Sequence, residues 1–313
     1  MTAAKPTPAS ATDWSASARY FEYTKAADPA VPSVPYDVFP SSRHESGPSR
    51  VIPWDLSAVL RCPWPATSPN LLANFVRIRA GESVDTAARA TSQLFYVIRG
   101  SGRSLVQGDH ASGRAFSWSI GDVIALPAAA AVAHAADADA ALYWVTDQPL
   151  LDDLGVAPTT ERFAPAIYRR EALAAELARV RAEPGAERRN RMGIILGNAD
   201  TAQTMTATHV LWSLLNVLPA GAVQKPHRHN SVALDLCIAA SPGTCTLIAE
   251  KIADDGSLID PIRAEWQPGS AFVTPPGLWH SHHNESADDA LVLPIQDAGL
   301  HTWMRTLDIR FSR

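Results

Sequence analysis

Three histidines have the spacing of a metal-binding site. His227 and His229 are separated by one residue, so on a β-strand their side chains point to the same side. His280 follows in a later stretch, which a neighbouring strand of a small barrel would bring beside them. Imidazole nitrogens that converge in this way bind a divalent metal and leave positions open for water, substrate or O2. The sequence therefore predicts a metal site of His227, His229 and His280.

The two stretches follow the patterns G-x5-H-x-H from Gly221 and G-x5-P-x-G-x2-H-x3-N from Gly269. This pair resembles the cupin signature, which implies a β-barrel with the metal inside. Many cupins add a glutamate shortly after the second histidine, but Ala233 and Leu234 occupy those positions here. We therefore expect a site of three histidines, in which the metal keeps its full charge and favours an anionic, chelating ligand such as a phenolate.

Asp235 has the strand parity of the first two histidines, so its side chain is expected to face the same cavity. We expect it to act on the substrate or to support the site rather than to bind the metal directly.

Short apolar stretches separated by Gly and Pro begin at Leu71 and indicate a β-barrel or sandwich. Leu173, Leu177 and Val180 recur at helical spacing before Pro184, which predicts one helix in a linker. A second β-rich region follows. The predicted division is an N-terminal arm at 1–50, partly disordered, a barrel without metal ligands at 51–160, a helical linker at 161–205 and a metal-binding barrel at 206–313.

The first barrel repeats the spacing of the second without its histidines. Counted from Gly81 and from Gly121, with Pro127 and Ala129 at their motif positions, the three ligand positions are occupied by Ala87, Arg89 and Val132. His134 lies two residues beyond the last of these positions. The first barrel is therefore expected to bind no metal and to serve as scaffold, dimer contact or lid.

Aromatic residues between Arg19 and Phe39 suggest that this half of the arm packs on the other domain or on another subunit. The net charge of -5 and the pI of about 6.0 show no basic footprint for nucleic acid. No apolar stretch predicts a signal peptide or a membrane span. Three cysteines are few and odd in number, which favours a reducing, cytoplasmic location.

The segments around His227 and His280 resemble the gentisate 1,2-dioxygenase group, which includes enzymes that cleave salicylate and 1-hydroxy-2-naphthoate. The resemblance implies an all-β bicupin of two jelly-roll barrels, Fe(II) held by three histidines, and often a homo-oligomer. His282 matches a family histidine near substrate and oxygen, which makes it a candidate catalytic acid or base. Trp212 and Asn216 match family residues on the strand that leads into the first motif, which implies substrate binding.

The chain departs from this group in two ways. The family's working metal is usually in the N-terminal barrel, whereas here the histidines are C-terminal. The family also places an arginine for the substrate carboxylate where this chain has Asp235. A carboxylate beside another carboxylate is costly in a low-dielectric site. We therefore expect a ring whose amino or hydroxyl group faces Asp235, rather than gentisate itself.

The expected function is an Fe(II)-dependent dioxygenase that uses O2 to oxidise, and by resemblance to cleave, a hydroxylated aromatic compound. Zn, Mn, Ni or Cu could also occupy such a site. The chain has no G-x-G-x-x-G before a helix and no P-loop, so no organic cofactor is expected. A non-oxidative metal enzyme, such as an isomerase or hydrolase, and a binding protein without turnover remain alternatives.

Overall fold

The computed structural model describes residues 13–107, 113–128 and 131–312 and divides the chain into two units, 1–32 and 33–313. The first unit contains two short 3-10 helices, η1 (Trp14–Ser17) and η2 (Tyr23–Ala27). Its aromatic side chains are exposed, Tyr20 to 93%. The predicted homo-oligomer would bury such residues and stays a prediction. The disorder expected at the start of the arm falls on residues 1–12, which lie outside the described residues.

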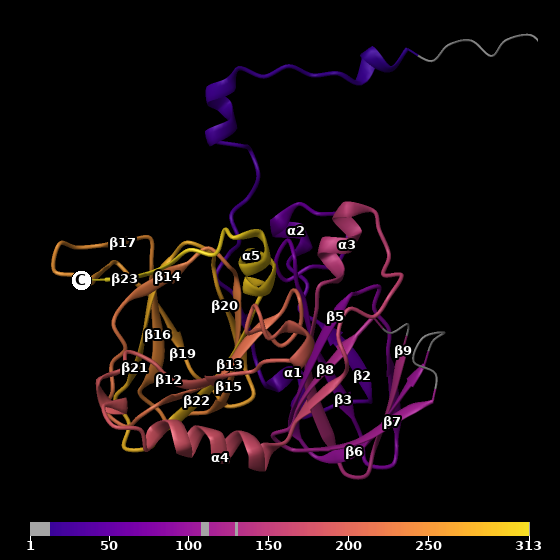
Figure 1. Ribbon diagram of the computed structural model, residues 1–313, viewed down its shortest axis with the longest axis vertical. Coiled ribbons are helices and arrows are strands. Elements are labelled where there is room, and N and C mark those ends of the chain that lie inside the picture. Colours follow the sequence, from indigo (N-terminus) through magenta and orange to yellow (C-terminus); the bar gives the residue numbers. More distant parts are fainter. Residues whose placement is uncertain (1–12, 108–112, 129–130, 313) are drawn as a thin grey trace, which may run out of the picture. The chain divides into compact units, whose positions relative to one another are not determined.

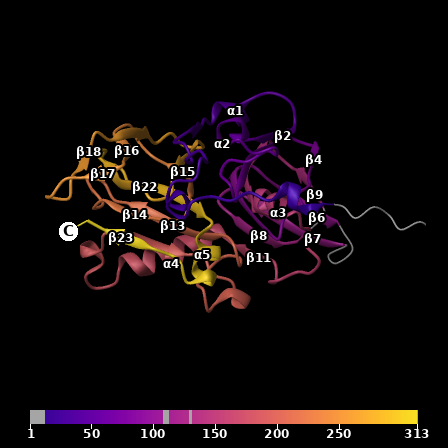
Figure 2. The same ribbon diagram turned by 90° about the horizontal axis from the view of Figure 1, so that it is seen from above.

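The second unit consists of two β-barrels, so the predicted all-β architecture is confirmed (Figures 1 and 2). In the first barrel, one sheet has the order β11 (Ala166–Tyr168), β8 (Val123–Pro127), β5 (Ser92–Arg99), β10 (Ala140–Thr146), β3 (Leu72–Ile78), β2 (Arg50–Pro53). The facing sheet has the order β4 (Ser83–Thr86), β9 (Ala131–Ala136), β6 (Ser101–Gln107), β7 (Arg114–Ser119).

The second barrel repeats this plan. Its six-stranded sheet has the order β1 (Val38–Phe39), β20 (Ala271–Thr274), β15 (Ala233–Ala239), β22 (Ala290–Gln296), β13 (Trp212–Leu218), β12 (Met192–Ile195). The facing sheet has the order β19 (Ile262–Glu265), β16 (Thr244–Ala249), β21 (Trp279–Asn284), β14 (His227–His229), β23 (Ile309–Phe311), and β17 (Lys251–Ile252) pairs with β18 (Leu258–Ile259).

In the described part of the second unit there are also seven helical segments: α1 (Ser42–Glu45), α2 (Ser57–Leu60), α3 (Gln148–Leu154), α4 (Arg170–Arg181), η3 (Ala186–Arg188), η4 (Ala199–Thr201) and α5 (Ala298–Met304). The helix predicted in the linker is α4. No helix of the described residues is long and apolar enough to cross a membrane.

The two six-stranded sheets pack against each other, and this contact forms the largest apolar core. Leu94 and Val123 of the first barrel belong to the same buried cluster as Leu234 and Leu293 of the second. Each of these sheets therefore has one face in its own barrel and one face between the barrels. This explains why β3 and β10 are buried along their whole length, whereas β6 of an outer sheet alternates between buried and exposed residues.

Segments assigned to the arm and the linker contribute edge strands to both barrels. β11, from the predicted linker, pairs with β8 of the first barrel, and β12, from the same linker, pairs with β13 of the second. β1, which precedes the first barrel in sequence, pairs with β20 of the second. Strand pairing thus extends beyond the predicted barrel limits, and the division into four domains stays a prediction.

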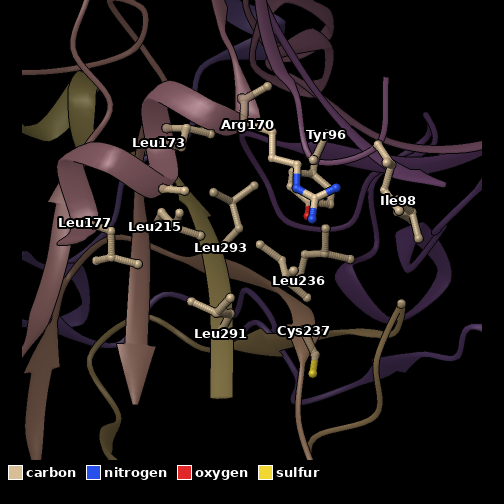
Figure 3. A pocket seen from close by; sticks show the side chains of 16 residues that line it. Tyr96, Ile98, Arg170, Leu173, Leu177, Leu215, Leu236, Cys237, Leu291 and Leu293 are labelled. Carbon is tan, nitrogen blue, oxygen red and sulfur yellow. The ribbon is translucent and has the colours of Figure 1, made fainter. Parts of the chain in front are cut away.

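An apolar cavity of about 370 Å³ lies where α4 crosses the two six-stranded sheets. Figure 3 shows Leu173 and Leu177 of α4 on the same side as Leu291 and Leu293 of β22, and the side chain of Arg170, the first residue of α4, beside Tyr96. This cavity belongs to the interface between the barrels.

Phe39 joins the two barrels. Its backbone belongs to β1, which pairs with the second barrel, and its ring stacks on aromatic side chains of the first barrel. The ring lies 4.1 Å from Phe75 and 5.2 Å from Trp54, between centroids, and is 4% exposed. We expect Phe39→Ala to lower the free energy of unfolding by about 3–5 kcal/mol, measured by urea denaturation. Val38→Ala, on the same strand but 40% exposed, is the control; equal losses in the two variants would contradict this role.

Candidate metal centre

The three predicted ligands come together between two adjacent strands. β14 pairs with β21 so that His227 lies directly opposite His280, with ring centroids 4.0 Å apart. His229 lies 4.9 Å from His280 between centroids, and all three residues are at most 4% exposed. Their potential ligand atoms lie within 4.8 Å of one another. Among the described residues, no other group of three His, Cys, Asp or Glu side chains meets this condition.

A glycine turn holds the two strands at this distance. Gly277 has a φ of 80°, a conformation that glycine adopts without strain. Its backbone N–H donates to the carbonyl oxygen of His229 at 2.7 Å. The glycine of the second motif therefore ties the approach to His280 to the strand that carries the other two histidines.

The hydrogen bonds of the rings suit metal binding. Nδ1 of His229 contacts the carbonyl oxygen of Ser231 at 2.9 Å, so it carries the proton and leaves Nε2 as a buried lone pair without a partner. Nδ1 of His280 contacts the carbonyl oxygen of Leu278 at 3.2 Å in the same way. Burial lowers the pKa of His229 to about 4 and the pKa values of His227 and His280 well below the usual value. Neutral rings with free nitrogens are what a divalent metal requires.

Arg191 also reaches this centre, although no sequence motif points to it. Its Nη2 is in close contact with Nε2 of His227 and lies 3.3 Å from Nε2 of His282, while its buried Nε has no partner in the described part of the chain. Burial lowers its pKa to about 10, so it stays protonated at pH 7. A guanidinium only donates hydrogen bonds. It therefore uses the His227 lone pair that a metal would use, and it places a positive charge beside the ligands.

Asp235 is 2% exposed and accepts a hydrogen bond from Oγ1 of Thr274 at 2.6 Å. Burial raises its pKa to about 6, while the Thr274 bond and the charge of Arg191 lower it. Asp235 is thus mostly ionised at pH 7, although burial works against the charge. The strand parity expected for Asp235 agrees with its burial inside the barrel.

Asn216 and Trp212 lie on β13, whose alternate residues Leu215 and Val217 belong to the core between the barrels. Asn216 therefore points the other way, into the second barrel. It is fully buried, and neither atom of its amide has a partner among the described residues. Trp212 has the same parity and is partly exposed at the start of the strand. Substrate contacts of both residues stay predictions.

His282 is 2% exposed and lies on β21 with its Nδ1 2.7 Å from Oγ1 of Thr246. Burial lowers its pKa well below the usual value, so the ring is neutral. His283, the next residue, is less buried and contacts Oγ of Ser281 at 2.9 Å. The strand brings only the first of these histidines to the side of the metal ligands, as its parity predicts.

The register of the first barrel corrects the predicted alignment by one residue. Thr86 lies opposite Val132, as His227 lies opposite His280. Ala87 and Arg89 are exposed, and Arg89 pairs with Asp152. Ala129 lies outside the described residues. The second barrel has one more residue before its first ligand, which the motif spacing did not reveal.

At two interior positions of the second barrel, those of Asp235 and Asn216, the first barrel has apolar side chains. Phe95 lies opposite Trp144 at the strand position where, in the second barrel, Asp235 lies opposite Pro294. Val76, opposite Leu142, has the register of Asn216, opposite Val292. Packing of these side chains replaces the polar interior of the second barrel.

Comparison with known proteins gives a consistent assignment of the fold. No protein-family model matches the chain. Salicylate 1,2-dioxygenase from Pseudoaminobacter salicylatoxidans, solved with gentisate, is similar with a TM-score of 0.69 at 15% identity, over 92% of this chain and 88% of that one. Oxalate decarboxylase from Bacillus subtilis is similar with a TM-score of 0.55 at 15% identity, over 82% of this chain and 76% of that one.

One curated relative, 5-aminosalicylate 1,2-dioxygenase from Comamonas sp., is 33% identical over 91 residues. The match covers 29% of this chain and 23% of the relative. The chain therefore has the bicupin fold. It is similar in fold to salicylate 1,2-dioxygenase and, over part of its sequence, to 5-aminosalicylate 1,2-dioxygenase.

Proposed function

We propose that the protein is an Fe(II)-dependent dioxygenase that cleaves the ring of a hydroxylated aromatic compound. The observation that carries the proposal is the group of three buried, neutral imidazoles with no carboxylate among them, in which Nε2 of His229 has no partner among the described residues. His227, His229 and His280 would hold the metal. Bound iron would supply a centre at which a chelating phenolate and O2 meet and electrons pass from the ring to oxygen. The similarity to salicylate and 5-aminosalicylate dioxygenases supports this chemistry.

Arg191 and Asp235 suggest which aromatic compound is bound. Arg191 provides a buried positive charge beside the ligands, which suits a carboxylate or a phenolate. Asp235 provides a buried acceptor, which suits an amino or hydroxyl group on the ring. A hydroxybenzoate with a further amino or hydroxyl group satisfies both residues, and the relative named for 5-aminosalicylate acts on a compound of this type. We propose that class as the substrate.

The expected result is oxygen uptake by the Fe(II)-loaded protein with 5-amino-2-hydroxybenzoate, and slower uptake with 2-hydroxybenzoate, which lacks the group for Asp235. The measurement is O2 consumption with an oxygen electrode, together with loss of the aromatic absorbance. A Zn(II)-loaded sample is the control, because zinc has no redox chemistry. Turnover without O2 consumption would favour the isomerase or hydrolase alternative, and binding without turnover would favour a binding protein.

A further inference from the structure

A chain of three buried side chains determines the protonated nitrogen of His282. Nε1 of Trp266 donates to Oγ1 of Thr246 at 2.8 Å, and the same oxygen lies 2.7 Å from Nδ1 of His282. The indole N–H only donates, so the hydroxyl accepts from it. Among the described residues, Nδ1 is the acceptor available to the hydroxyl's own proton. Nδ1 is then unprotonated, and the neutral ring carries its proton on Nε2.

The first barrel contains the same chain with one more member. Nε1 of Trp118 donates to Oγ of Ser104 at 2.8 Å, and this oxygen lies 2.7 Å from Nδ1 of His134. On the far side, Nε2 of His134 lies 3.0 Å from Oγ1 of Thr86, which lies 3.4 Å from the carbonyl oxygen of Val132. Every hydrogen of this chain is used when each group donates to the next one, starting from the indole N–H and ending at the carbonyl oxygen. This direction places the proton of His134 on Nε2.

The second barrel has no counterpart of the Thr86 hydroxyl, because His227 occupies that register. The polar group found near Nε2 of His282 is Nη2 of Arg191 at 3.3 Å, which is also a donor. If Arg191 donated to Nε2 instead, the proton would move to Nδ1 and the buried Thr246 hydroxyl would lose its acceptor. The contacts of 2.7 and 2.8 Å outweigh the longer one. Two donors therefore face each other, and an acceptor from a ligand would satisfy both.

We propose that Trp266 and Thr246 are positioning residues that keep the proton of His282 on Nε2, so that His282 and Arg191 together donate hydrogen bonds to an anionic oxygen of the substrate. The proposal deepens the proposed function, since the substrate oxygen rests on it. The position of the proton on His282 does not depend on the proposed function, because it follows from the protein's own hydrogen bonds.

The proton position can be measured by NMR on the full chain labelled with 15N-histidine and loaded with diamagnetic Zn(II). His282→Asn identifies the signals of His282. We expect a protonated Nε2 and an unprotonated Nδ1 in the natural protein and in Thr246→Ser, which copies the first barrel. Thr246→Val, of similar shape but without the hydroxyl, should give a mixture of the two forms, as should Trp266→Phe. A proton on Nδ1 in the natural protein, or an unchanged pattern in Thr246→Val, would overturn the proposal.

Substrate binding gives the second readout. With Fe(II)-loaded protein, Thr246→Val should lower kcat/KM by roughly tenfold, the value of one hydrogen bond to a charged group, while Thr246→Ser keeps most of the activity. Ser104→Ala, the matched change in the first barrel, should leave kcat/KM unchanged. Equal activity of the Val and Ser variants would contradict the positioning role. If the NMR result holds but no aromatic compound is oxidised, the proposed function fails while the proton position stands.

Discussion

Alanine at His227, His229 or His280 is expected to abolish metal binding. The natural protein should bind about one divalent metal per chain, because the described residues contain one group of three ligands. Loss of a residue that only hydrogen-bonds to a metal ligand weakens metal affinity by up to roughly 100-fold. Loss of a ligand itself should weaken the affinity by more than that. Metal content after dialysis, measured by elemental analysis, is the test, and the same measurement names the metal that the protein retains.

Two controls separate ligand loss from general damage. His283→Ala changes a neighbouring histidine on the same strand, and Val132→Ala changes the first barrel at the position equivalent to His280. Both variants should keep the metal. Two metals per chain, or one bound in the first barrel, would overturn the view that Thr86 and Val132 replace ligands there.

The second large effect is expected when Arg191 or Asp235 is replaced, because each of these buried charged residues is proposed to bind a different group of the substrate. Arg191→Met should lower kcat/KM for hydroxybenzoates by about ten- to a hundredfold, the value of one charge-assisted contact. Asp235→Asn should reduce the preference for 5-amino-2-hydroxybenzoate over 2-hydroxybenzoate. Asp235→Arg, which supplies the arginine of the gentisate group, should shift preference towards acids with a carboxylate at that side.

The measurement is kcat/KM for paired compounds with and without the carboxylate, and with and without the amino group, on each variant. Because Arg191 and Asp235 influence each other's pKa, each variant also needs its melting temperature and metal content determined. If the natural protein turns over both members of each pair equally, and Asp235→Arg changes nothing, these residues do not select the substrate.

Much of the metal centre follows from the sequence, because strand periodicity is a local property. Residues separated by one position lie on the same face of a strand, so the strand period alone assigns His227 with His229, and His280 with His282, to one side. The same rule placed Asp235 inside the barrel. The two-barrel fold also followed, since its signals are short strands, turn glycines and a repeated spacing.

The sequence alone thus predicted the barrel fold, the three histidines that the structure brings together, and the apolar Val132 at the position that His280 has in the second barrel. The tertiary structure decided that Arg191, from a segment expected to be a linker, reaches His227. It also decided that Thr86, and not Ala87, lies opposite Val132. The reason is physical: the face of a strand is fixed by its own backbone, whereas the register of a strand pair and the approach of a distant side chain depend on packing between segments far apart in the chain.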